Sequence, residues 1–269
     1  MDLSLCHHRA WHSKLRERQF VMSATVDLLD PKAPRRVLLI ASNPTVSKQT
    51  GFPIGFWWSE LTHPYWTFRE HGYTVDIASP DGGVLRADSW SDPRDASGYS
   101  ADDLISLGFM SSPEHAKLIE TTISLASVDA SRYDAVMLIG GQGPMYTFID
   151  NEPLHRFVAA QYDAGKITAL ICHATCALLK IKLSDGSLLV KGKTWTGFAN
   201  SEEDYADAYV GRPIQPFRIQ NEAAKITETN FIVAQRFKPF AVRDGLLITG
   251  QQQYSGARAA HLVIEALGQ

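Results

Sequence analysis

Two periods of hydrophobic and polar residues alternate along the chain, and they predict an α/β fold. Short continuous apolar runs, rich in β-branched residues, predict buried strands. These runs occupy residues 36–42, 74–79, 134–139, 167–172 and 194–198, and a pair at 239–242 and 246–249 flanks a tight Asp244-Gly245 turn. Apolar residues at helical spacing lie between them and predict helices over 56–71, from Ser111 through Leu125, over 153–164, from Ala174, from Ser201 and over 255–267.

Capping residues and proline indicate where some of these predicted helices begin. Ser111 and Pro113 announce a helix that carries Leu118, Ile119, Ile123 and Leu125, with Glu114 placed for a capping box. Asn200 is placed to cap the helix that begins at Ser201. Residues 84–110 show little periodicity and many Asp, Ser and Gly, which indicates an insertion.

Strands that alternate with helices predict a mostly parallel sheet with helices on both faces. We expect one α/β domain over 34–269, with the insertion at about 84–110. Residues 1–33 are expected to be an unstructured extension. The first 22 of them hold three of the nine histidines but no second cluster to complete a metal site, and Met22 is a candidate alternative start.

Composition narrows the class of protein. Of the 269 residues, 45% are hydrophobic and 20% charged, with a net charge of -3, so there is no basic field for nucleic acid. No apolar run approaches the roughly 20 residues that span a bilayer. Three cysteines do not suggest a disulfide framework. We therefore expect a reduced cytoplasmic protein that binds neither nucleic acid nor membrane.

Cys172 stands where an apolar strand gives way to a helix-favouring sequence. Ligands of open α/β sheets bind at the carboxyl ends of strands, and a nucleophile on a sharp strand-to-helix turn is exposed there. A helix N-terminus would also lower the thiol pKa. Cysteine is nevertheless often buried and inert, as Cys176 is expected to be, so this position alone leaves both interpretations open.

Two neighbouring features are equally ambiguous. His173 could act as a base, but adjacent side chains on a strand diverge, and only a strained elbow would bring it to the thiol. The glycine-rich stretch 140–143 follows another strand and could supply oxyanion N–H groups or be only a tight turn. The stretch from Cys172 to Cys176 has no metal-ligand spacing.

From about Arg36 onward, the chain resembles the ThiJ/PfpI superfamily, and within it the glyoxalase III-like branch that includes stress-induced chaperone-like proteins. Four stretches carry the resemblance: GFWWSELTHPYWTFREHGYTVDIASPDGG, YDAVMLIGGQGPMYTF, ALICHATCALL, and GKTWTGFANSEED with DGLLITGQ. The resemblance implies a flavodoxin-like fold of the class I glutamine amidotransferase type, with a nucleophile elbow at a strand end. It also suggests a homodimer.

The same resemblance implies roles for single residues. Cys172 resembles the nucleophile, His173 the proton shuttle and Glu203 the acid that orients the histidine, although Asn200-x-x-Glu203 also reads as a capping box. Glu60 matches the glutamate that contacts the sulfur, although it could be only a first-turn acid. The N–H groups of Gly141 and His173 would be the oxyanion donors.

Some positions depart from the family pattern and concern the substrate. The family commonly has Gly-Pro where this chain has Ala174-Thr175, histidine where it has Gln142, and Asn-Pro where it has Gln252-Gln253. All of these could line the site. Tryptophans could add apolar surface there or be core residues: Trp57, Trp58 and Trp195.

The function implied is a cofactor-independent glyoxalase, a cysteine-dependent lyase. Cys172 would add to methylglyoxal or a related reactive carbonyl, and a 2-hydroxy acid would leave without glutathione or metal. One alternative is a hydratase or hydrolase acting on a C–N bond, such as an isonitrile or amide-like substrate. Another is a holding chaperone or redox sensor without turnover.

Overall fold

The computed structural model describes residues 35–268, so the predicted extension over 1–33, with Cys6, lies outside the described part. The strands of its main sheet are β1 (Arg36–Ile40), β4 (Thr74–Ser79), β5 (Ile123–Ser124), β6 (Ala135–Leu138), β7 (Ile167–Ile171), β10 (Ala241–Asp244) and β11 (Leu247–Gly250). Two small ribbons are formed by β2 (Thr45–Val46) with β3 (Pro53–Ile54) and by β8 (Thr194–Trp195) with β9 (Asn230–Phe231).

The main sheet has the order β10-β11-β7-β6-β1-β4-β5. All neighbours run parallel except β10 and β11, which form the antiparallel hairpin predicted at Asp244-Gly245. Parallel strands need crossover connections, and helices supply them here. The alternating pattern predicted this mainly parallel sheet, and the flavodoxin-like α/β fold that the resemblance implied is confirmed.

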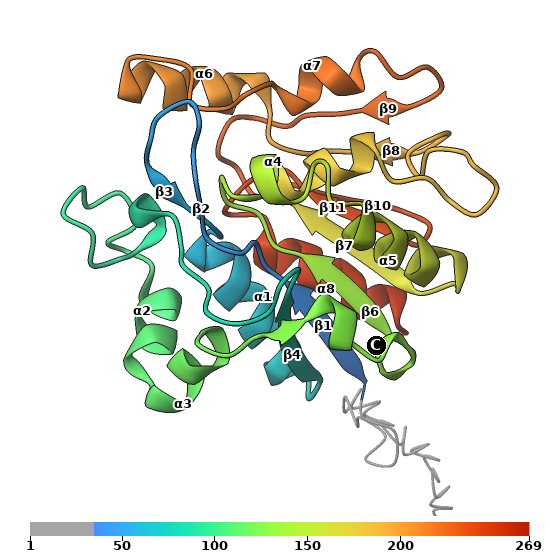
Figure 1. Ribbon diagram of the computed structural model, residues 1–269, viewed down its shortest axis with the longest axis horizontal. Helices are drawn as coiled ribbons and strands as arrows, with labels where there is room; N and C mark the ends of the chain where they lie inside the picture. Colours follow the sequence, from blue (N-terminus) through green and yellow to red (C-terminus); the bar gives the residue numbers. More distant parts are fainter. Residues whose placement is uncertain (1–34, 269) are drawn as a thin grey trace, which may run out of the picture.

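Helices cover both faces of this sheet (Figure 1). The α-helices among the described residues are α1 (Trp58–Glu70), α2 (Leu104–Ser111), α3 (Pro113–Ala116), α4 (Pro144–Thr147), α5 (Glu152–Asp163), α6 (Asn200–Val210), α7 (Ile219–Ala223) and α8 (Gly256–Ala266). On one face, α1 packs against α8, β1 and β4, and on the other α5 packs against β6 and β7. Figure 1 shows α6 and α7 beyond the sheet, at the top of the view.

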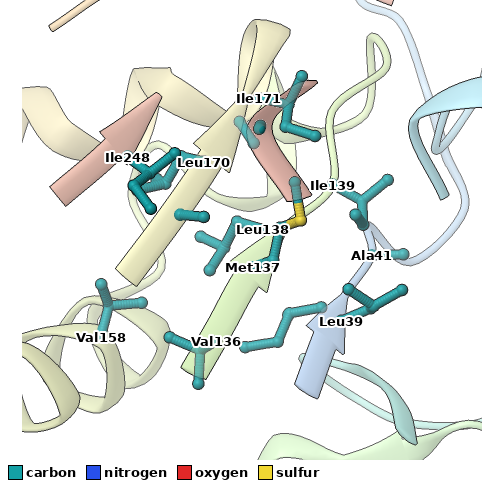
Figure 2. Close-up of a cluster of buried hydrophobic side chains, with 14 of the residues drawn as sticks. Leu39, Ala41, Val136, Met137, Leu138, Ile139, Val158, Leu170, Ile171 and Ile248 are labelled. Atoms are coloured by element: carbon teal, nitrogen blue, oxygen red, sulfur yellow. The ribbon is translucent and has the colours of Figure 1, made fainter. Parts of the chain in front are cut away.

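The central strands carry the core because both of their faces are covered. Every residue of β6 and β7 is buried, which is why each reads as a continuous apolar run rather than an alternating one. Figure 2 shows side chains of neighbouring strands side by side, among them Leu39 of β1, Leu138 of β6 and Leu170 of β7, with Val158 of α5 at the lower left.

The helix predicted from Ser111 through Leu125 is wrong. The chain forms α2, then the single turn of α3, then a 3₁₀ turn at Lys117–Ile119. Pro113 disfavours a helical conformation for the residue before it, so α2 ends there. Ile123 instead pairs with Ala78 and extends the sheet as β5. The predicted capping box is also wrong, because the α3 N-cap makes no side-chain hydrogen bond.

Two further segments differ from their predicted extent. The aperiodic stretch 84–110 includes most of α2, whose N-cap Asp103 accepts a hydrogen bond from the backbone of Ser106. The strand predicted over 194–198 is only β8, and it pairs with β9 rather than with the main sheet. Among residues 35–268, no helix is long and apolar enough to cross a membrane.

Candidate active site

The candidate site lies where β6 and β7 end. These strands pair in parallel with Leu138 opposite Leu170, so their carboxyl ends lie at the same level. Cys172 follows β7 directly, and the glycine turn 140–143 follows β6. Parallel pairing therefore places the thiol beside the glycine turn, as expected for a ligand site in an open α/β sheet.

A strained backbone turn aims the thiol of Cys172. Its φ of 54° is in the left-handed region, which a residue with a Cβ seldom adopts. The helix predicted from Ala174 begins at Cys172 itself and is a 3₁₀ helix, Cys172–Leu179. Thr175 Oγ1 donates a hydrogen bond to the carbonyl of Cys172 at 2.6 Å and holds the turn. Backbone strain of this kind persists only where the surrounding structure holds it in place.

The same turn brings His173 to the thiol. Cys172 Sγ lies 3.4 Å from His173 Nδ1, although side chains of adjacent residues on a regular strand point apart. The imidazole is 4% exposed, and the ring of Phe198 stacks on it with centroids 4.1 Å apart. The orientation of the histidine is therefore fixed by packing as well as by hydrogen bonds.

Glu203 completes a row of three polar groups. Its Oε1 lies 3.2 Å from His173 Nε2, and both side chains are buried. The capping-box interpretation of Glu203 is wrong, because α6 begins one residue earlier than predicted, with Ala199 as its N-cap. The reciprocal bond comes from Glu202, whose Oε2 accepts the Ala199 N–H at 3.0 Å. Glu203 is thereby free to face the histidine.

Glu60 lies on the other side of the thiol. It is fully buried in the first turn of α1, and its Oε2 accepts the N–H of Gly140 at 3.0 Å. Burial raises the pKa of Glu60 to about 8, against the opposing effects of hydrogen bonds to Cys172 and Gly140. The carboxyl is therefore protonated at neutral pH and places no negative charge beside the thiol.

The predicted lowering of the thiol pKa is wrong. Burial and the neighbouring Glu60 carboxyl raise the pKa of Cys172 above its ordinary value, although backbone N–H groups of His173 and Gly141 act in the opposite direction. At 3% exposure the thiol loses more hydration than a helix N-terminus restores. The resting cysteine is consequently a thiol that needs a base, and His173 lies in position to act as one.

The glycine turn has no room for side chains. A Cβ on Gly140 would lie 2.5 Å from Glu60 Oε2 and 2.8 Å from the Cβ of Cys172. Gly141 has a φ of 110°, and a Cβ there would lie 2.6 Å from the backbone nitrogen of Trp57. The turn is therefore tightly packed against its neighbours. This close packing places the Gly141 N–H where it faces the Cys172 sulfur.

Asp88 is a buried acid of this site that sequence reasoning missed. Its Oδ1 accepts the N–H of Gly55 at 2.9 Å and its Oδ2 the N–H of Gln142 at 2.7 Å. Burial raises the pKa of Asp88 to about 7. The carboxyl ties the glycine turn to the loop before α1. Nothing in the aperiodic stretch distinguished this aspartate from its exposed neighbours.

A cavity that is partly open to solvent lies in front of Cys172 and His173. Its polar lining includes Gln142 and Gln253, and most of its wall is aromatic. These aromatic side chains are Trp57, Trp90, Tyr99, Phe198, Tyr205, Tyr209 and Phe237.

The cavity decides between the alternatives left open for several residues. Of the three tryptophans considered, Trp57 lines it, whereas Trp58 and Trp195 are buried in the core. Ala174 is also a core residue, and Gln252 donates to the Lys238 carbonyl instead of lining the cavity. Within residues 35–268, no three His, Cys, Asp or Glu side chains are grouped to hold a metal ion.

The structure thus brings together every predicted site residue, although their catalytic roles are predictions. Around the thiol of Cys172 lie the imidazole of His173, its partner Glu203 and the carboxyl of Glu60. The glycine turn and the cavity wall add Gly141, Gln142 and Trp57.

Several known proteins are similar to this chain in sequence or in architecture. Two probable glutathione-independent glyoxalases of Schizosaccharomyces pombe are similar to the chain. One is 30% identical over 152 residues, 56% of this chain and 68% of the relative. The other is 25% identical over 239 residues, 81% of this chain and 92% of the relative. The crystal structure of glyoxalase III from Candida albicans, 23% identical, superposes with a TM-score of 0.70 over 86% of this chain and 97% of that one, which supports the fold.

A protein-family profile matches most of the chain. It is that of the DJ-1/PfpI family, and it aligns with residues 55–265. This range runs from the loop before α1 into the last helix and includes both strand ends that form the site. Because the match takes in most of the chain, the protein belongs to the DJ-1/PfpI family.

Proposed function

We propose that the protein is a cofactor-independent glyoxalase, which converts a 2-oxoaldehyde into a 2-hydroxy acid through a covalent adduct on Cys172. The observation that carries the proposal is the buried row of thiol, imidazole and carboxyl at the floor of a cavity. The relatives named as glutathione-independent glyoxalases support it at the level of the family.

The first step forms the adduct. The thiol proton passes to His173 Nδ1 as the sulfur attacks the aldehyde carbon, and Glu203 stabilises the resulting imidazolium. The aldehyde oxygen takes up negative charge near the N–H groups of Gly141 and His173, which already face the sulfur. The imidazolium of His173 returns its proton to this oxygen, which gives a hemithioacetal and leaves His173 neutral for the next step.

The second step moves hydrogen between two carbons. A base, for which His173 is placed, removes the proton from the former aldehyde carbon, and an enediol forms. Return of a proton to the former ketone carbon gives a thioester of the 2-hydroxy acid. Water then cleaves the carbon–sulfur bond and restores the thiol. One carbon is oxidised while its neighbour is reduced, so the net reaction consumes only water.

A substrate panel tests this function. The purified chain is incubated with methylglyoxal in the absence of glutathione, and lactate is measured against the Cys172→Ala variant. Lactate formation that depends on Cys172 is the expected result. If lactate does not exceed the variant's background, and the other 2-oxoaldehydes of the panel give no hydroxy acid, the glyoxalase proposal fails.

Hydration or hydrolysis at a C–N bond is the second candidate function. Gln142 is the reason to test it, because this side chain lines the cavity where the family commonly has histidine, so the polar group that meets the substrate differs from the family's. Isonitriles and amides therefore belong in the same panel. The redox-sensor alternative loses support because oxidation favours an accessible, low-pKa thiol, whereas Cys172 is buried and its pKa is raised.

A further inference from the structure

Most of the wall of the cavity in front of Cys172 consists of aromatic rings, a surface that suits a flat apolar group. Six of its aromatic rings form three edge-to-face pairs: Trp57 with Tyr99, Trp90 with Tyr209, and Tyr205 with Phe237. These rings come from segments far apart in sequence, namely the loop before α1, the stretch 84–110, α6 and the loop before β10. A seventh ring, Phe198, stacks on His173 beside the reacting thiol.

One of these aromatic residues has a strained backbone conformation. Phe237 has a φ of 55°, which is unusual for a bulky residue. Glu202 Oε1 accepts its N–H at 3.0 Å, and the guanidinium of Arg236 lies 5.0 Å from the neighbouring Tyr205 ring. A strained residue held in this way at a cavity points to a role in what the cavity binds.

The wall also excludes charged substituents. No Lys, Arg, Asp or Glu is among the described residues that line the cavity, and its Tyr99 hydroxyl already accepts a hydrogen bond from Gln253 at 3.1 Å. A phosphate or carboxylate on the substrate would lose its hydration there without gaining a cationic partner among these residues. The methyl group of methylglyoxal, in turn, would leave most of the aromatic surface without contact.

We infer that the preferred substrate is an aryl-substituted 2-oxoaldehyde, ArCOCHO, whose ring lies against the aromatic wall while its aldehyde faces Cys172. The chemistry rests on the proposed function, and the ring preference rests on the cavity alone. Water and ArCOCHO give ArCH(OH)COOH: the aldehyde carbon is oxidised to the carboxylic acid and the ketone carbon is reduced to the carbinol. Faces of aromatic side chains favour stacked or edge-on rings over aliphatic groups of similar size.

Ala206 offers a variant that fills the cavity without touching the catalytic groups. This small side chain lines the cavity on α6, between the two tyrosines of that helix. Ala208, two residues on, is exposed and does not line the cavity, so Ala208→Leu is a matched control. In the wild type, kcat/KM for phenylglyoxal should exceed that for methylglyoxal by about tenfold or more.

The ratio of the two kcat/KM values is the first readout. Ala206→Leu should lower the ratio several-fold, whereas Ala208→Leu should keep it. Comparing ratios between proteins cancels the intrinsic reactivity of the two aldehydes. A wild-type ratio below one, or a ratio that Ala206→Leu leaves unchanged, would overturn the ring preference while the glyoxalase proposal stands.

A second readout does not depend on turnover. Iodoacetamide labelling of Cys172 is measured in the presence of acetophenone, cyclohexyl methyl ketone or acetone. Acetophenone should protect at a concentration about tenfold or more below that of acetone, and also below that of the cyclohexyl ketone. Equal protection by acetophenone and either other ketone would refute the inference, even if the protein proves not to be a glyoxalase. Protection without turnover of any 2-oxoaldehyde would refute only the proposed function.

Discussion

Glu203 Oε1 lies 3.2 Å from His173 Nε2, whereas the adjacent Glu202 turns back to the backbone of its own helix. Two consecutive buried glutamates therefore have separable tasks. Glu203 can fix the tautomer of His173 that presents an unprotonated Nδ1 to the thiol, as an orienting acid does in a catalytic triad. Glu202 holds the start of α6 and accepts bonds from Gln251 and Phe237.

Substituting the two glutamates should give opposite results. We expect Glu203→Gln to lower kcat by about 10²- to 10⁴-fold with little change in Tm, because an amide does not stabilise the imidazolium. Glu202→Gln should instead lower Tm, since each lost hydrogen bond costs about 1 kcal/mol, or roughly 2–4 °C for a domain of this size. Steady-state kinetics and thermal unfolding of both variants provide the comparison. Near-normal kcat in Glu203→Gln would show that the carboxylate does not orient the histidine.

The glycine turn makes a second prediction. Gly140→Ala should lower kcat at least tenfold, because its Cβ would meet both the Glu60 carboxyl and Cys172 and would displace the reacting groups. Gly108→Ala is the matched control, since a Cβ on this helical glycine meets nothing within 4 Å. We expect the control to keep its activity and to gain up to about 1 kcal/mol of stability. Equal activity of the two variants would contradict the tight packing around Gly140.

Thiol labelling tests the pairing of Glu60 with Cys172. The pKa of Glu60 is raised to about 8, so above that pH its carboxylate opposes formation of the neighbouring thiolate. Glu60→Gln should therefore speed iodoacetamide labelling of Cys172 above pH 8 and change it much less at pH 6. Peptide mass spectrometry follows the reaction, with the fully buried Cys176 as an internal reference. Slower labelling of the variant above pH 8 would mean that Glu60 assists thiolate formation instead.

The central strands could be predicted because each is buried on both faces and therefore consists mainly of consecutive apolar residues. The run Ile167–Ile171 is fully buried and largely apolar, with three β-branched residues, and its predicted and observed bounds differ by at most one residue. The helix expected through Ile123 failed for the opposite reason. Its local spacing favoured a helix, but pairing of Ile123 with Ala78, 45 positions earlier, decides the conformation, and single-residue patterns do not report such distant partners.

The residues of the site could be predicted better than their arrangement in space. The resemblance pointed to Cys172, His173 and Glu203 and implied a nucleophile elbow, but the left-handed φ of Cys172 and the resulting 3.4 Å contact of its sulfur with His173 belong to the folded chain alone. A one-residue error in the start of α6 gave the capping role to Glu203 instead of Glu202. Asp88 could not be found, because its significance depends on two backbone N–H groups that approach it only in the folded chain.

Two buried acids make a final prediction about stability and pH. Burial raises the pKa of Glu60 from 4.5 to about 8 and that of Asp88 from 3.8 to about 7. The folded protein therefore holds these protons more tightly than the unfolded chain does. The stability that they contribute is fully present below about pH 4 and is lost as the pH rises through 7 to 8.

Chemical denaturation at pH 5 and at pH 8.5 measures this loss. The free energy of unfolding of the wild type should fall between the two pH values, because over most of this range the unfolded chain has released both protons while the folded protein still holds them. Glu60→Gln removes one titrating group, so its fall should be smaller by up to a few kcal/mol, at about 1.4 kcal/mol for each pKa unit. Asp88→Asn should reduce the fall in the same direction, and the exposed Glu70→Gln should keep the wild-type dependence. If the wild type is instead more stable at pH 8.5, or if Glu60→Gln falls as steeply as it does, Glu60 is ionised in the folded protein at neutral pH. The assignment of a neutral carboxyl beside the Cys172 thiol would then be wrong.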